Sequence, residues 1–317
     1  MKSEKGTLVI SIDFESELGY ADEKLSESQK KLVVNESEIS KKILELFEKY
    51  DTPATWAIVG HLLEDDCGTR DGRVHADFPE HIYNDSEVDW FENHPSAEDI
   101  TNPLWFDSAG IIDRVKNSSV AHEIGSHSYA HILYGAPNIK KKAIEADISG
   151  LKRIHQKHNL EMFSFIFPRN MEGYHKELKE AGFICFRGES KFWYMSLPGF
   201  LRRLARLVDY YLPSAKTVLP SKHKSGLINI PDSLLLLGRN GLRKLVLPSV
   251  MKRKIRSGLN QAVKRKEIFH FWFHPSNLSY ETETQLEILD YALRYASGLR
   301  DKGWLEVSTM KQVADKD

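Results

Sequence analysis

The chain has 317 residues, of which 41% are hydrophobic and 10% aromatic, and its formal net charge is −1. This composition supports a sizeable core and excludes a globally disordered chain. The near-neutral charge and the lack of a nucleic-acid-binding motif argue against a nucleic-acid partner.

Buried, β-branched runs alternate with amphipathic helices along the chain. We expect strands at 7–13, 54–59, 123–124, 163–168, 183–186, 267–274 and 304–307. We expect helices at 38–50, 109–117, 140–158, 174–181 and 281–299. Strands that alternate with helices favour a parallel sheet or barrel with right-handed crossovers. The pattern therefore predicts an α/β protein of about seven strand–helix units.

Two stretches interrupt this pattern and carry opposite charges. Residues 64–107 contain 13 acidic and 2 basic residues, whereas residues 199–266 contain 16 basic and 2 acidic residues. We expect one domain over residues 1–317, with an acidic insertion at about 64–107 and a basic insertion at about 190–266. The basic amphipathic segment 201–208 is typical either of a solvated helix face or of contact with anionic membranes.

The cysteines and the apolar runs indicate the compartment. Cys67 and Cys185 are too few for a disulfide framework. No apolar run reaches the ~20 residues that a membrane span needs, and no signal peptide precedes the first strand. We expect a cytoplasmic protein, for which the basic insertion allows peripheral contact with the inner face of the membrane.

Acidic and histidine residues form two patterns that suit metal chemistry. Asp13 and Glu15 stand two apart at a strand end, so both carboxylates point to one face. They read as a metal ligand beside a general base, or as a solvated strand end. His127 and His131 stand four apart and project the same way if a helical turn begins there. They read as two metal ligands, or as surface or capping histidines.

Two further residues follow predicted strands. His274 ends an alternating run just before Pro275, where an imidazole suits a general acid. Arg169 follows Pro168 and is expected to pair with a carboxylate such as Asp13, the alternative being a surface arginine. Because the chemistry of parallel α/β folds sits at the carboxyl ends of strands, we expect one shared site.

These motifs, in this order, resemble those of the polysaccharide deacetylases, the NodB-like members of carbohydrate esterase family 4. The matching segments are Ser11-Ile-Asp-Phe-Glu15, Thr55-Trp-Ala-Ile-Val-Gly60, His127-Ser-Tyr-Ala-His131, Pro168-Arg-Asn170 and Trp272-Phe-His-Pro275. The His-Ser-x-x-His segment is the specific one. The first segment departs from the family pattern, because Phe14 separates two acidic residues that are usually adjacent aspartates.

The resemblance implies a distorted (β/α) barrel with one divalent metal ion, usually Zn²⁺. The implied metal ligands are Glu15, His127 and His131, and the implied catalytic residues are Asp13 as base, Arg169 as its orienting partner and His274 as acid. The implied reaction is hydrolysis of an N-acetyl group on an amino sugar. Without an export signal, we expect a nucleotide- or lipid-linked precursor of a surface polysaccharide, such as lipopolysaccharide, as substrate.

Two other functions remain open. The first is another C–N hydrolase on the same fold, a deformylase or an amidase of cyclic substrates, because some divergent family branches resemble the Asp-Phe-Glu spacing. The second is an inactive relative that only binds carbohydrate. The complete set of metal ligands, base and acid argues against the inactive relative.

Overall fold

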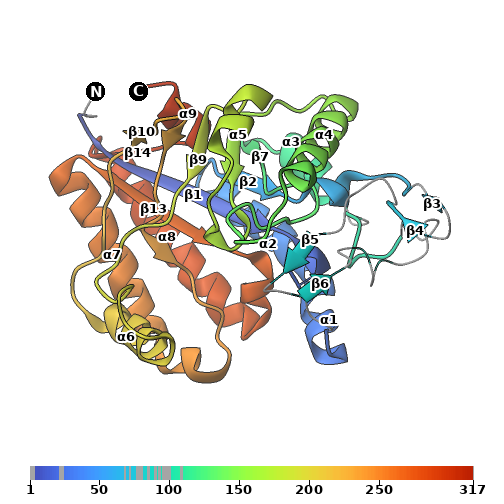
Figure 1. Ribbon diagram of the computed structural model, residues 1–317. Helices are drawn as coiled ribbons and strands as arrows, with labels where there is room; N and C mark the ends of the chain where they lie inside the picture. Colours follow the sequence, from blue (N-terminus) through green and yellow to red (C-terminus); the bar gives the residue numbers. More distant parts are fainter. Residues whose placement is uncertain are drawn as a thin grey trace.

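The structure is a computed structural model. It describes residues 4–20, 25–67, 69–70, 73–75, 81–83, 86–88, 91, 94, 101–107 and 110–316. A curled, mostly parallel sheet forms its centre, with helices outside it and both termini on one side (Figure 1). The predicted α/β barrel is confirmed in this half-barrel form.

All seven expected strands are present. The central strands, in spatial order, are β9 (Cys185–Arg187), β8 (Ser164–Ile166), β7 (Glu123–Ser126), β2 (Thr55–Ile58), β1 (Gly6–Phe14) and β13 (Ile268–Phe273). The remaining expected strand, β14 (Leu305–Val307), pairs with the first residues of β1. Because β1 is buried along its whole length, it forms the centre of the sheet and fixes where Asp13 emerges.

The helices cover the outside of the sheet. They are α1 (Glu27–Val34), α2 (Glu36–Lys49), α3 (Ile111–Lys116), α4 (Lys141–Lys157), α5 (His175–Ala181), α6 (Gly199–Tyr211), α7 (Pro248–Arg265), α8 (Thr282–Asp301) and α9 (Met310–Ala314). In α2, Ile39, Ile43 and Phe47 are buried on one face, as helical spacing requires. Burial of each contributes about 1.5–3 kcal/mol. None of the described helices has both the length and the apolar character needed to span a membrane.

The basic stretch contributes more to the barrel than we expected. It supplies β10 (Ser221–Lys222), β11 (Ile228–Asn229) and β12 (Leu234–Leu235), and the latter two extend the sheet at its opposite edges beside β9 and β13. Helix α7 packs against β1 and β13. Much of this stretch is therefore part of the fold rather than an insertion into it.

The acidic stretch stands beside the barrel (Figure 1). Within its described residues, β3 (Thr69–Arg70) pairs with β4 (Arg73–Val74), and β5 (His81–Tyr83) pairs with β6 (Ser86–Val88), both antiparallel. The chain enters this stretch from the single-turn 3₁₀ helix η2 (Gly60–Leu63) that follows β2.

Candidate active site

The expected site residues gather at the carboxyl ends of the central strands. A pocket of about 280 Å³ opens there, and ten residues line it. These are Asp13, Glu15, Gly19, Tyr20, His131, Arg169, Asn170, Arg187, Trp272 and His274. Five of the six expected residues are in this lining, and His127, the sixth, contacts Glu15 from below. The parallel order of the strands brings segments more than 250 residues apart to one mouth.

Three side chains converge on one point, and we call them the mouth cluster: Glu15, His127 and His131. Oε2 of Glu15 lies 3.3 Å from Nε2 of His127 and 3.0 Å from Nε2 of His131. All three residues are buried. These three ligand atoms could hold one metal ion.

The hydrogen bonding of His127 leaves its Nε2 atom suited to binding a cation. Its Nδ1 lies 2.9 Å from the carbonyl oxygen of Ile166, which can only accept, so Nδ1 carries the proton. In the neutral ring Nε2 then directs a lone pair at a carboxylate oxygen. A cation between the two removes this repulsion, and a carbonyl that fixes the tautomer is typical of metal-binding histidines.

The electrostatics favour an ionised Glu15 and a neutral His131. Burial raises the pKa of Glu15, but the electrostatic interaction with His274 and the contacts of His127 and His131 outweigh it, so the pKa lies well below the ordinary value. Burial is the main reason that the pKa of His131 is lowered. An anionic oxygen beside a neutral imidazole is the form in which both bind a divalent metal.

Asp147 of α4 fixes the loop that carries the two histidines. Its carboxylate accepts hydrogen bonds from the backbone N–H groups of Tyr129 and Ala130, from the Ser128 hydroxyl and from the Tyr134 hydroxyl. Ser128 and His131 both have positive φ values, 66° and 58°, which cost energy for residues other than glycine. The buried carboxylate therefore stabilises a strained loop and so aims both imidazoles at Glu15.

Gly19 leaves room for the Glu15 carboxylate. A Cβ atom on Gly19 would lie 2.5 Å from Oε1 of Glu15, much closer than side-chain atoms pack. Gly19 lies in the 3₁₀ helix η1 (Ser16–Tyr20), which follows β1 directly. The loop and the carboxylate are therefore fitted to each other.

Asp13 is held by an arginine that we did not expect. Nη1 of Arg187 donates to Oδ1 of Asp13 at 2.7 Å, and Nη2 donates to Oδ2 at 2.6 Å. Both side chains are buried, and the guanidinium lies 4.1 Å from the centre of the Trp272 ring. Burial raises the pKa of Asp13, but chiefly because of Arg187 the net pKa is lowered.

The bidentate partner of Asp13 is therefore Arg187, not Arg169 as expected. Arg169 lines the same pocket, and its Nη2 donates to the carbonyl of Gly19 at 3.3 Å. Its φ of 51° is positive, as is that of Asn170. Arg187 ends β9, so it too lies at the carboxyl end of a strand, where functional residues are expected. The preceding Phe-Ile-Cys-Phe run contains no acidic or histidine residue that would have marked it as part of the site.

His274 faces both carboxylates from the far wall. Its Nε2 lies 3.7 Å from Oδ2 of Asp13 and 3.5 Å from Oε1 of Glu15. The side-chain amide nitrogen of Asn277 lies 3.1 Å from Nδ1. An amide nitrogen only donates, so Nδ1 accepts and the ring proton sits on Nε2. The Nε2–H group therefore points into the pocket.

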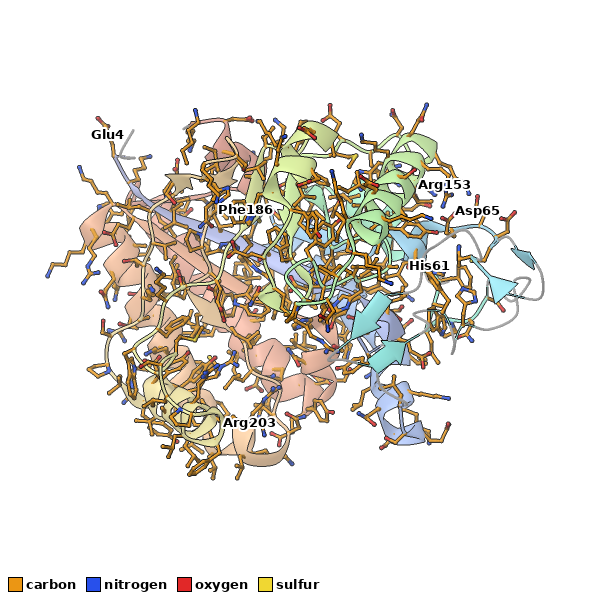
Figure 2. The ribbon with its side chains drawn as sticks, viewed as in Figure 1. Glu4, His61, Asp65, Arg153, Phe186 and Arg203 are labelled. Atoms are coloured by element: carbon orange, nitrogen blue, oxygen red, sulfur yellow. The ribbon has the colours of Figure 1, made fainter. Side chains whose placement is uncertain are left out.

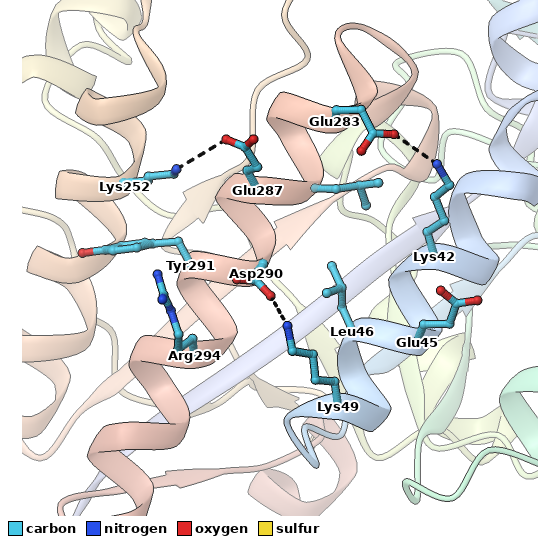
Figure 3. A pocket seen from close by; sticks show the side chains of 11 residues that line it. Lys42, Glu45, Leu46, Lys49, Lys252, Glu283, Glu287, Asp290, Tyr291 and Arg294 are labelled. Carbon is cyan, nitrogen blue, oxygen red and sulfur yellow. Dashed lines mark hydrogen bonds and ion pairs between the residues drawn. The ribbon is translucent and has the colours of Figure 1, made fainter.

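A second, larger groove on the protein contains no comparable set of carboxylates and histidines among its lining residues. It has a volume of about 630 Å³ and lies mainly between α2 and α8 (Figure 3). Its charges neutralise one another in pairs, Lys42 with Glu283 at 3.2 Å and Lys49 with Asp290 at 2.8 Å. Exposed pairs of this kind contribute little energy, so we place the chemistry in the smaller pocket.

Comparison with solved structures identifies the fold. Over 100% of this chain and 91% of the other, it superimposes on a candidate polysaccharide deacetylase from Mycobacterium smegmatis with a TM-score of 0.60 and 13% identity. The chain has the polysaccharide deacetylase fold. Over 98% of this chain and 89% of the other, it matches a probable polysaccharide deacetylase from Pseudomonas aeruginosa PAO1 with a TM-score of 0.59 and 12% identity.

A structure that carries a different hydrolase name also superimposes on this chain. Puue allantoinase matches over 99% of this chain and 91% of its own, with a TM-score of 0.60 and 12% identity. No family model and no curated protein sequence matches the chain. At such low identity the superpositions establish the fold, and the reaction has to be argued from the pocket.

Proposed function

We propose that this protein is a metal-dependent hydrolase that removes an N-acetyl group from an amino sugar of a glycan or glycan precursor. The observation that carries the proposal is the convergence of the mouth cluster with Asp13 and His274 on one pocket. Three ligands leave positions open on a metal ion, which is typical of catalytic rather than structural sites.

In this proposal Glu15, His127 and His131 hold one divalent ion, with zinc as the expected metal. Two imidazoles and one carboxylate suit zinc. Bound there, the ion would polarise the acetamide carbonyl and lower the pKa of a water molecule. The remaining steps fall to side chains of the pocket.

Asp13 accepts the proton of the attacking water. Arg187 keeps its carboxylate ionised and fixes its direction, while the oxygens retain lone pairs for the proton. His274, as an imidazolium protonated on both ring nitrogens, then donates its Nε2 proton to the departing amine and returns to the neutral ring; its position beside both carboxylates suits this role. Arg169 holds the Gly19 carbonyl and so positions the loop beside Glu15.

We expect only one small ring of the substrate to enter the pocket. A pocket of about 280 Å³ lies at the low end of the range for ligand sites, which suits a single sugar residue rather than a buried oligosaccharide. Trp272 forms part of its wall, and an aromatic face suits the apolar side of a sugar ring. The rest of the substrate, a nucleotide or lipid carrier, would lie outside.

The experiment that tests the proposal measures acetate release from acetamido sugars. Free, nucleotide-linked and oligomeric N-acetylhexosamines should be compared using zinc-loaded wild type and His127→Ala. We expect acetate from at least one class, lost together with one zinc ion in the variant. Zinc-loaded wild type that releases no acetate from any class would contradict the proposal.

The allantoinase match supports a second candidate function. A cyclic amidase would use the same metal ligands, base and acid, and a pocket of about 280 Å³ also suits a small cyclic substrate. Cyclic ureides and imides in the same substrate panel separate the two functions. Ring opening without acetate release would assign the pocket to amidase chemistry.

We also propose that the protein reaches a lipid-linked substrate at an anionic membrane surface. Helix α6 exposes Phe200, Leu204 and Val208 to solvent beside Arg202 and Arg203. Apolar side chains flanked by arginines are typical of interfacial helices. Wild type should sediment with anionic vesicles at low salt, and Phe200→Ser/Val208→Ser should not. Equal sedimentation of both would contradict this surface.

A further inference from the structure

A second group of metal-binding side chains lies beside the barrel, and we call it the insertion cluster: His61, Cys67, His75 and His94. Nε2 of His61 lies 3.1 Å from Nε2 of His75 and 3.0 Å from Nε2 of His94. The Cys67 sulfur lies 3.3 Å from Nε2 of His61 and 3.5 Å from Nε2 of His94. All four ligand atoms lie within 4.8 Å of one another.

Hydrogen bonds within the cluster cannot account for this packing. Nδ1 of His61 lies 3.1 Å from the carbonyl oxygen of Trp105, so it carries the proton of the neutral ring and Nε2 presents its single lone pair. Yet Nε2 meets two nitrogens and a sulfur at hydrogen-bond distance. One lone pair accepts one such bond well, whereas a cation at the centre receives all four ligands at once.

The distances are close to those expected around a tetrahedral ion. Ligands at roughly 2.0–2.1 Å for nitrogen and 2.3 Å for sulfur stand about 3.3–3.6 Å apart in a tetrahedron around zinc. Four of the six separations run from 3.0 to 3.5 Å, and the other two lie within 4.8 Å. The backbone carbonyl of Trp105 provides the outer contact that fixes the tautomer of a metal-binding histidine.

Aromatic side chains flank the cluster. The ring centre of His94 lies 4.8 Å from that of Trp105, and that of His75 lies 4.4 Å from that of Phe91. Phe106 and Tyr129 flank the His61 ring at 5.4 and 6.0 Å. Four protein ligands complete the coordination of a zinc ion and leave no position for a substrate, which is typical of structural zinc sites.

We propose that His61, Cys67, His75 and His94 form a second metal site, a structural zinc site that is separate from the mouth cluster. It joins the acidic stretch to the barrel, because His61 belongs to η2 directly after β2 and the other three ligands come from the stretch. In Figure 2, His61 lies where the chain leaves the barrel toward β3 and β4, far from Arg203 on α6.

The site would organise the walls of the active site. The backbone N–H of His61 donates to the carbonyl of Tyr129 at 2.8 Å, within the loop that carries His127 and His131. On the other side, the carbonyl of Leu104 accepts from the Ser16 hydroxyl at 2.8 Å and from the Glu17 N–H at 3.0 Å. The residues around the site thus contact the segments after β1 and β7.

The test is cobalt loading of the full-length apoprotein, with metal content and the absorption spectrum as readouts. We expect about two ions per chain and a near-ultraviolet sulfur-to-cobalt charge-transfer band, because a tetrahedral site with a thiolate ligand gives one and a Glu-His-His site cannot. Cys67→Ser should lose the band and weaken binding of one ion. The matched control Cys185→Ser, which removes a buried thiol on β9, should keep both.

His127→Ala keeps the test decisive if Cys67→Ser does not fold. This variant retains all four ligands of the insertion cluster, so it should bind one cobalt ion and show the full band. Absence of the band from both wild type and His127→Ala would overturn the proposal. A band without acetate release from any substrate would leave the structural site standing and reject the proposed function instead.

Discussion

The mouth cluster and the insertion cluster use similar ligands in opposite settings. The mouth cluster has one oxygen and two nitrogens and borders an open pocket that also contains Asp13 and His274. The insertion cluster has three nitrogens and a sulfur and is flanked by aromatic rings. A site with three ligands leaves room for water and substrate, whereas one with four is complete. The mouth cluster therefore suits a catalytic metal site, and the insertion cluster suits a structural one.

The two clusters also differ in what holds the ligands. Glu15 and His127 follow β1 and β7 directly, so the sheet positions them without a metal. His75 and His94 lie in a stretch with little regular structure among its described residues. We therefore expect metal binding at the insertion cluster to be coupled to local folding, whereas the mouth cluster is preorganised.

The largest expected effect separates catalysis from metal binding at the mouth. His274→Gln removes the acidic Nε2 proton but no metal ligand, so acetate release should fall by about 10²–10⁴-fold while both ions remain. Initial rates and metal analysis of the same preparation measure this. His223→Gln, which lies outside the pocket lining, is the matched control. An ion lost in His274→Gln would show that this histidine is a ligand.

Arg187→Met tests whether the mouth depends on its buried ion pair. Removing the guanidinium leaves Asp13 buried without its charged partner, which should destabilise the fold by about 3–5 kcal/mol. Urea unfolding measures this loss. Arg239→Met removes a pair with Glu281, whose side chain is 38% exposed, and should cost about 1 kcal/mol or less. Similar losses in both variants would contradict a special role for the buried pair.

The sequence predicted the barrel and the mouth cluster because both follow local patterns. Buried β-branched runs marked the seven strands, and the strand-end rule placed Asp13, Glu15 and His274 together. Which of the two arginines, Arg169 or Arg187, pairs with Asp13 depends on how the ends of their two neighbouring strands are placed in a curled sheet. No local sequence pattern encodes that placement.

Other features had weak or nonlocal signals. Strands β10, β11 and β12 are two residues each, too short for a period of alternation. The insertion cluster spreads from His61 to His94 with unequal spacings, unlike the short paired spacings by which zinc sites are read from sequence. Its ligands meet only because the acidic stretch folds back on η2.

Gly19→Ala should weaken the mouth and leave the insertion cluster unchanged. The added Cβ would displace the Glu15 carboxylate, and disturbance of a ligand by its surroundings typically lowers metal affinity by about 10–100-fold. Competition with a chelator measures the affinity, and the cobalt–sulfur band reports the other cluster. Gly298→Ala, where the new Cβ meets nothing within 4 Å, is the control. Unchanged affinity would show that the η1 loop moves to accommodate the methyl group.

The smallest expected effect concerns His122, which belongs to neither cluster and so isolates what burial does to an imidazole. Its Nδ1 accepts a hydrogen bond from the Ala54 N–H at 3.1 Å, and its ring packs on Phe47 at 5.5 Å. Burial is the main reason that its pKa falls to about 4. Since the unfolded chain has a pKa near 6.5, the unfolded state binds more protons between these values. Stability is therefore lost as pH falls below about 6.5.

From about pH 6.5 to pH 5 this single group should cost roughly 1.5 kcal/mol, because the unfolded imidazole is only half protonated at pH 6.5 and the full slope of about 1.36 kcal/mol per pH unit is reached below it. The free energy of unfolding of His122→Gln should depend less steeply on pH than that of wild type by this amount. Urea titrations of both proteins at the two pH values measure the difference, in which acid release of metal from either cluster cancels. Parallel pH profiles would mean that the His122 ring is protonated in the folded state, and that burial alone does not keep histidines neutral beside this sheet. In that case the neutral ligands of both clusters would depend on the bound ion itself.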